Sequence, residues 1–209
     1  MTEARRKLVL VGAVREMAVL ADRLGWSIAI VVDPALTTRK AWAGCGEVHV
    51  RDDEAMARAI DIGVLDVAFA TDQPALRKKL YHQWRDRGFR APNLLGEEFG
   101  PGCGLADGIV VQASATMSCD LTLGVGARVN MRGVVMHDCV LEPFATVAPN
   151  ATLLGHVHVG ECAYIGAGSV VLPGRSIGSD AVVGAGAVVT RDVMSGQVVI
   201  GVRATELRR

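Results

Sequence analysis

The sequence predicts two parts of different architecture, a small α/β domain at residues 1–98 and a parallel β-solenoid at residues 99–209. Three observations lead to this division. Residues 7–98 alternate apolar runs of strand length with amphipathic stretches of helix length. From Val111 onward, an aliphatic residue returns at every sixth position. Between the two patterns lies the stretch 96–104, whose glycines break any regular element.

The elements of the N-terminal part follow from its apolar runs. In chain order we expect a strand at 7–12, a helix at 15–24, strands at 26–33 and 47–50, a helix at 53–62, a strand at 65–70 and a charged surface helix at 74–87. Asp53 would cap the second helix, and Gly88 would end the third. Strands and helices that alternate with short connections indicate a small parallel sheet of Rossmann type.

The turn after the first strand is where a nucleotide-binding domain of this type carries its glycines. It reads Gly-Ala-Val-Arg-Glu-Met from Gly12 to Met17, which keeps only the first glycine of a G-x-G-x-x-G pattern. Arg15 at the helix start could pair with a phosphate, although Glu16 beside it would oppose one. Asp33, at the end of the second strand, could meet a ribose or a base. The alternative is that Arg15 and Asp33 are ordinary surface and turn residues.

The second part keeps one register over fourteen hexads. The aliphatic positions are Val111, Met117, Leu123, Val129, Val135, Leu141, Val147, Leu153, Val159, Ile165, Val171, Ile177, Val183 and Val189. Four residues after most of them stands a small side chain, as at Ala115, Ala127, Gly133, Cys139, Ala145, Ala151, Ala163, Ser169, Ala181 and Ala187. Neither a helix nor an alternating strand has this period, whereas a solenoid of triangular coils places one hexad on each face. Three hexads make one coil, so residues 105–194 form about five coils.

The composition narrows the range of partners. The chain has 209 residues with 22 basic and 22 acidic side chains, so its zero formal charge gives no support for a nucleic-acid or anionic-membrane partner. No apolar run approaches the roughly 20 residues of a membrane span. The polar start at residues 1–7 lacks the apolar core of a signal peptide. The five cysteines form no CxxC pair, and we expect a reduced, cytoplasmic protein without structural zinc.

Polar residues interrupt the repeats in one region. His137 is followed by Asp138, and Asn130 stands seven residues earlier. The imidazole of His137 could take a proton from a nucleophile while a carboxylate fixes its tautomer. Because adjacent residues of a strand face opposite ways, the sequence leaves open whether Asp138 supplies that carboxylate. His156, nineteen residues after His137, would stack above Asp138, and His158 is expected to be an ordinary surface group.

One segment of the repeats resembles a known signature. From Val129 to Val140 the chain reads Val-Asn-Met-Arg-Gly-Val-Val-Met-His-Asp-Cys-Val, which resembles sugar acyltransferases of the sialic-acid O-acetyltransferase and nucleotide-amino-sugar N-acetyltransferase group. The repeats and tail from Val159 to Ala204, and the phrase Ala-Thr-Asp-Gln-Pro-Ala-Leu-Arg-Lys-Lys-Leu at residues 70–80, are similar to further parts of that group. The resemblance covers nearly the whole chain, because the group also carries a small Rossmann-like domain before a left-handed parallel β-helix.

The resemblance implies an acetyl-CoA-dependent acetyltransferase that acts on the amino group of a nucleotide-linked sugar. It also implies a homotrimer with its site at subunit interfaces, and threefold association would cover the flat faces that a short prism exposes. His137, with Asp138 beside it, would be the general base, and Asn130 would contact the acceptor group of the sugar. The CoA arm would lie along the backbone near three positions, Gly155, Ala167 and Ala185. No metal is expected.

Three other interpretations fit parts of the sequence. The same scaffold could O-acetylate sialic acid or a related sugar. A metalloenzyme of the γ-carbonic-anhydrase type would need three converging histidines, and the spacing of His137, His156 and His158 does not resemble that arrangement. A non-catalytic trimeric scaffold would explain the missing glycines after Gly12, and also Arg203, which stands where the acyltransferase group usually has proline.

Overall fold

The computed structural model describes residues 5–34, 46–202 and 205–206, so Cys45 and Arg203 lie outside the described residues. The chain divides into two compact units. Unit 1 comprises Met1–Thr71 and Lys79–Pro92, and unit 2 comprises Asp72–Lys78 and Asn93–Arg209. The short segment 72–78 therefore groups with the later unit, although it precedes the end of the earlier one in sequence.

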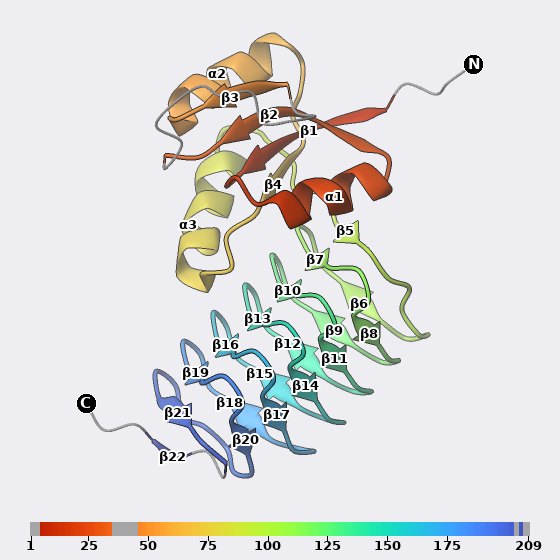
Figure 1. Ribbon diagram of the computed structural model, residues 1–209, viewed down its shortest axis with the longest axis vertical. Helices are drawn as coiled ribbons and strands as arrows, with labels where there is room; N and C mark the ends of the chain where they lie inside the picture. Colours follow the sequence, from red (N-terminus) through yellow and green to blue (C-terminus); the bar gives the residue numbers. More distant parts are fainter. Residues whose placement is uncertain (1–4, 35–45, 203–204, 207–209) are drawn as a thin grey trace. The chain divides into compact units, whose positions relative to one another are not determined.

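Unit 1 contains a four-stranded parallel sheet in the order β3-β2-β1-β4 (Figure 1). Its strands are β1 (Arg6–Val11), β2 (Trp26–Val32), β3 (Glu47–His49) and β4 (Val67–Phe69). The helices of this region are α1 (Arg15–Arg23), α2 (Asp52–Asp61) and α3 (Pro74–Arg85), the last of which begins within segment 72–78. Every element expected here is present, with ends that differ from the prediction by at most two residues. The buried runs of β1, β2 and β4 explain the parallel sheet, since such strands are apolar on both faces.

The prediction that Asp53 caps α2 was wrong. The cap position belongs to Arg51, which makes no side-chain capping bond, and Asp53 is the second residue of the helix. The carboxylate of Asp53 instead accepts hydrogen bonds from the guanidinium of Arg51 at 2.7 and 3.0 Å. The acidic first turn of α2 still suits the partial positive charge at a helix N-terminus.

Unit 2 is a parallel β-helix whose hexads form two-residue strands in three sheets (Figure 1). The first sheet contains β5 (Leu94–Leu95), β7 (Val110–Val111), β10 (Arg128–Val129), β13 (Thr146–Val147), β16 (Tyr164–Ile165), β19 (Val182–Val183), β21 (Val198–Ile200) and β22 (Thr205–Glu206). The second contains β8 (Thr116–Met117), β11 (Val134–Val135), β14 (Thr152–Leu153), β17 (Val170–Val171) and β20 (Val188–Val189). The third contains β6 (Gly104–Leu105), β9 (Thr122–Leu123), β12 (Val140–Leu141), β15 (His158–Val159) and β18 (Ser176–Ile177).

The hydrophobic column inside the coils explains why the chain winds in this way. Partners in adjacent coils are eighteen residues apart, as in the pairing of Val135 with Leu153. The second residue of each hexad strand points inward, and Val135 and Leu153 are fully buried. A small residue four positions later is also buried, as Cys139 is. Aliphatic residues stack on aliphatic residues in successive coils, and small residues stack on small ones. This stacking buries one continuous core, as predicted from the register of the repeats.

Most corners between the sheets turn through a residue with positive φ. The expected glycines fill part of these positions, including Gly168 and Gly186. Residues with side chains take the same conformation at Ser114, Asp120, Arg132, Asp138, Phe144, Asn150, His156, Cys162 and Asp180. This conformation costs an L-residue about 1–2 kcal/mol, so the ladder of the solenoid must hold these corners in place.

Within the ranges described, the chain has no helix that combines the length and the apolar character needed to cross a bilayer.

Candidate functional site

The polar residues expected within the repeats come together at one corner of unit 2. His137 and Asp138 follow β11, and His156 follows β14 in the next coil. Nδ1 of His137 lies 2.8 Å from Oδ2 of Asp138, and Nε2 of His156 lies 3.7 Å from the same oxygen. The two imidazole rings meet edge to face with their centroids 5.2 Å apart. All three side chains are partly exposed, so a ligand can reach them.

The structure shows that Asp138 supplies the carboxylate beside His137, which the alternation of strand residues had left undecided. Asp138 does not lie on a strand but at a corner, where its φ of 58° turns the chain. Its carboxylate therefore lies on the same side as the neighbouring imidazole. Because a carboxylate can only accept, Nδ1 of His137 donates the hydrogen bond and Nε2 keeps its lone pair. This is the tautomer that a general base requires.

The ring of His137 lies against Gly155 in the next coil. A Cβ atom on residue 155 would lie 2.6 Å from Cε1 and 2.8 Å from Nε2 of the imidazole. The backbone N–H of His156 donates to the carbonyl of His137 at 3.0 Å, which fixes the two coils at this level. Gly155 was expected to contact CoA, and the structure shows that its missing side chain leaves room for the imidazole.

Asn130 is buried, with 4 % of its surface exposed. Its Nδ2 atom donates to Oδ1 of Asp72 at 3.2 Å, and Nη1 of Arg128 donates to the same oxygen at 3.0 Å. Asp72 belongs to segment 72–78, which groups with the β-helix. The structure thus places Asn130 in a network of the protein's own side chains, and its predicted contact with a sugar stays a prediction.

Arg77, also in segment 72–78, is a buried residue that the sequence did not reveal. The sequence placed it on a charged surface helix, yet only 2 % of its surface is exposed. Its guanidinium donates to the carbonyls of Gly126 at 2.9 Å and Phe144 at 2.6 Å, and to Oγ1 of Thr146 at 2.7 Å. Burial lowers the pKa of Arg77 to about 9, which leaves the group charged at neutral pH. One arginine among several charges on a helix gives no sequence signal of burial.

The turn after β1 in unit 1 is tight. Gly12 has a φ of 98°, and a Cβ there would lie 3.1 Å from the Cβ of Ala70. Oδ2 of Asp33 accepts a hydrogen bond from the backbone N–H of Ala13 at 2.8 Å. Asp33, expected to meet a ribose or a base, therefore closes the turn that begins at Gly12. Arg15 is exposed at the start of α1.

Ala167 and Ala185 lie eighteen residues apart and are both exposed. They occupy the corner before β17 and β20, whereas His137 occupies the corner after β11. Both corners border the second sheet. No atom lies within 4 Å of a Cβ built on the adjacent Gly168 or Gly186. The corner therefore leaves backbone accessible to an extended ligand.

The outer face of the second sheet is largely apolar. Its partly exposed apolar side chains are Val134, Met136, Leu154, Val170, Leu172 and Val188. We call this set the apolar face. Thr116 and Thr152 also point outward on this sheet. A cluster of exposed apolar side chains of this kind is typical of a surface that a partner covers.

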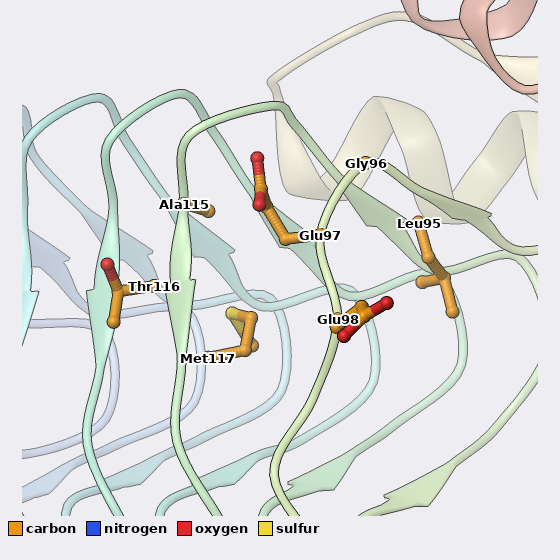
Figure 2. Close-up of a pocket in the computed structure, with 7 residues that line it drawn as sticks. All are labelled: Leu95, Gly96, Glu97, Glu98, Ala115, Thr116 and Met117. Carbon is orange, nitrogen blue, oxygen red and sulfur yellow. The ribbon is translucent and has the colours of Figure 1, made fainter.

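A depression of about 590 Å³ opens at the first coil and was not predicted. Figure 2 shows its lining, which consists of Leu95, Gly96, Glu97, Glu98, Ala115, Thr116 and Met117. β8, which carries Thr116 and Met117, pairs with β11, and His137 follows two residues after β11 ends. The depression thus lies one coil before the His137 corner.

Among the residues that the structure describes, one group offers three atoms that could hold a metal ion. They belong to His137, Asp138 and His156 and lie within 4.8 Å of one another. His158, the third histidine of the metalloenzyme interpretation, is not part of the group: it lies on β15 of the third sheet, where its Nε2 is 3.1 Å from Oε1 of Glu142.

Comparisons with known proteins match this architecture. The model of the bacterial transferase hexapeptide family (six repeats) matches residues 156–191. GDP-perosamine N-acetyltransferase of Escherichia coli O157:H7 is 36 % identical over 110 residues, and the match spans half of this chain and half of that enzyme.

The solved structures that resemble the chain over its length include two acetyltransferases. A histidine-to-alanine mutant of GDP-perosamine N-acetyltransferase from Caulobacter crescentus, in complex with CoA and GDP-perosamine, is 32 % identical with a TM-score of 0.89, and all of both chains is covered. The acetyltransferase domain of PglB from Neisseria gonorrhoeae FA1090, in complex with acetyl coenzyme A, is 26 % identical with a TM-score of 0.85 over 98 % of this chain and 100 % of that one. The predicted fold class, a Rossmann-like domain followed by a left-handed parallel β-helix, is confirmed.

Proposed function

The chain belongs to the hexapeptide-repeat sugar acyltransferases, and from that premise we propose that it transfers the acetyl group of acetyl-CoA to the amino group of a nucleotide-linked sugar. The observation that carries the proposal is the His137–Asp138 pair, 2.8 Å apart at an accessible corner of the β-helix. The names of two relatives, both GDP-perosamine N-acetyltransferases, make a GDP-linked amino sugar the first acceptor to test.

In the proposed reaction His137 is the general base. The amine nitrogen forms a bond to the thioester carbonyl carbon while Nε2 of His137 accepts a proton from that nitrogen. The carbon–sulfur bond then breaks, and the proton passes from His137 to the leaving sulfur. Asp138 holds Nδ1–H and stabilises the imidazolium that forms between these steps. The amide and the free thiol account for every atom and proton of the amine and the thioester.

Acetyl-CoA supplies the activated acyl group of this reaction. The corner at Ala167 and Ala185 supports a site for its extended arm, because small exposed residues leave the backbone open there. The complexes of the Caulobacter enzyme with CoA and of the Neisseria domain with acetyl-CoA support the same cosubstrate. Gly155 remains a proposed contact beside the base.

For the acceptor, Asn130 remains the proposed contact to the sugar. The turn at Gly12, which Asp33 closes, remains the proposed nucleotide contact in unit 1. The depression one coil before His137 offers further space on the same sheet for part of the acceptor. The proposed enzyme is a cytoplasmic homotrimer.

The test is the release of free thiol from acetyl-CoA by the full-length protein, with GDP-perosamine and with UDP- and CMP-linked sugars as acceptors. We expect turnover with an amino sugar, and a kcat lower by about 10²–10⁴-fold in His137→Ala, the usual contribution of a general base. His158→Ala is the control, because that imidazole pairs with Glu142 and should not affect turnover. Wild-type kcat in His137→Ala would refute the proposed base.

Product analysis separates N-acetylation from the O-acetylation alternative. An acetyl group on nitrogen is an amide and survives alkaline hydroxylamine, whereas an acetyl group on oxygen is an ester and is removed. Calorimetry with acetyl-CoA tests the scaffold alternative, since a non-catalytic scaffold that has lost its donor site should not bind it. A hydroxylamine-labile product would reassign the acceptor atom without changing the role of His137.

A further inference from the structure

At the corner that carries His137, histidine, aspartate and cysteine side chains, which are common metal ligands, stack in a column over successive coils. Residues eighteen apart stack, so Cys119 and Asp120 precede His137 and Asp138 by one coil, and His156 follows Asp138 by one coil. One nitrogen of each imidazole and one oxygen of Asp138 already lie within 4.8 Å of one another. Oδ2 of Asp138 lies 2.8 Å from Nδ1 of His137 and 3.7 Å from Nε2 of His156.

Backbone hydrogen bonds connect the successive coils that carry these side chains. The N–H of His156 donates to the carbonyl of His137 at 3.0 Å, and the N–H of Asp138 donates to the carbonyl of Cys119 at 3.2 Å. Asp138 and His156 share the left-handed corner conformation, with φ of 58° and 60°. The three side chains therefore approach one another because of the solenoid register and not through the chance position of a loop.

The donor set suits one class of ion. Two neutral imidazoles and a carboxylate are ligands of Zn²⁺ and of similar divalent transition metals, which keep a fourth position for water. Bonds of about 2.0–2.2 Å place tetrahedral ligand atoms about 3.3–3.6 Å apart. The candidate ligand atoms lie within 4.8 Å of one another, which is wider than this spacing. Their side chains are 44 to 65 % exposed and can rotate to bring the atoms closer together.

We propose that His137, Asp138 and His156 bind a divalent transition-metal ion such as Zn²⁺, and that the bound ion inhibits the enzyme. A neutral imidazole has one lone pair. Whichever nitrogen of His137 binds the metal, the other carries the proton, so the residue can no longer accept one from the amine. Metal binding stands on the geometry alone, whereas inhibition rests on the proposed function.

Zinc binding is measured by calorimetric titration of zinc chloride into chelator-treated full-length protein, with cobalt(II) absorption as a report of tetrahedral ligation. The diagnostic variant is His156→Asn, because asparagine tolerates the left-handed corner conformation and removes the imidazole. We expect one ion per chain in the wild type and at least about tenfold weaker binding in His156→Asn. His158→Asn is the matched control and should bind zinc as the wild type does. Cys119→Ser should also keep the site.

Inhibition is measured as the ratio of thiol release with and without zinc in each variant. We expect the wild type to be inhibited and to recover with EDTA, and His156→Asn to need at least about tenfold more zinc for the same effect. Equal zinc affinity in the wild type and His156→Asn would overturn the site, as would loss of binding in Cys119→Ser alone. Absence of turnover with intact zinc binding would refute the proposed function and leave the metal site standing. Turnover without zinc binding would refute the metal site and leave the proposed function standing.

Discussion

At the corner that carries His137, the imidazole ring lies against Gly155 of the next coil. The constraint on residue 155 is space and not backbone conformation, because its φ is outside the left-handed region. The atoms that an added Cβ would meet are Cε1 and Nε2, at the far end of a flexible side chain. The ring can therefore move aside at little cost to folding, although the proposed proton acceptor then leaves its place.

Gly155→Ala should separate stability from catalysis. We expect the free energy of unfolding to change by less than about 1 kcal/mol, while kcat falls by about tenfold to a hundredfold because the base is displaced. Urea unfolding and thiol release measure the two quantities. Gly104→Ala is the matched control, since nothing lies within 4 Å of a Cβ built there. An unchanged kcat in Gly155→Ala would contradict the packing argument.

At the scale of the element, the start of α3 is attached to the β-helix through Arg77. One guanidinium satisfies carbonyls from two successive coils, those of Gly126 and Phe144, and also the hydroxyl of Thr146. A helix that is charged along its length thus contributes one fully buried cation to unit 2. The contacts explain why segment 72–78 groups with that unit.

Arg77→Met should destabilise the protein strongly. Methionine keeps the apolar stem but leaves buried carbonyls without donors, which costs about 3–5 kcal/mol. Lys78→Met is the control, because the neighbouring ion pair between Lys78 and Glu161 is exposed to solvent and should contribute little. Urea unfolding of both variants gives the comparison. Equal midpoints would mean that the Arg77 contacts are not maintained in solution.

At the scale of the whole molecule, the apolar face of the second sheet indicates where subunits would meet. It lies between the His137 corner and the corner with Ala167 and Ala185, so its burial would bring a second chain close to both. That placement agrees with a site at subunit interfaces, which the proposed homotrimer requires.

Val170→Lys should weaken the trimer. The substitution puts a charge in the middle of the apolar face, and burying an unpaired charge opposes association. Thr122→Lys is the control, because Thr122 is an exposed outward residue on a strand of the third sheet. Light scattering should show a mass below that of three chains for the first variant only. A monomeric wild type would refute the trimer itself.

The sequence alone determined the period of the β-helix, its inward aliphatic column, the elements of unit 1 and the stacking of His156 above Asp138. These features are local or repeat at a constant spacing, so each follows from counting along the chain. Tertiary structure decided that Asp138 faces His137, because a corner residue with positive φ does not follow strand alternation. It also decided that Asp72 engages Asn130 and that Arg77 is buried, since those contacts join residues about fifty or more positions apart and no period encodes them.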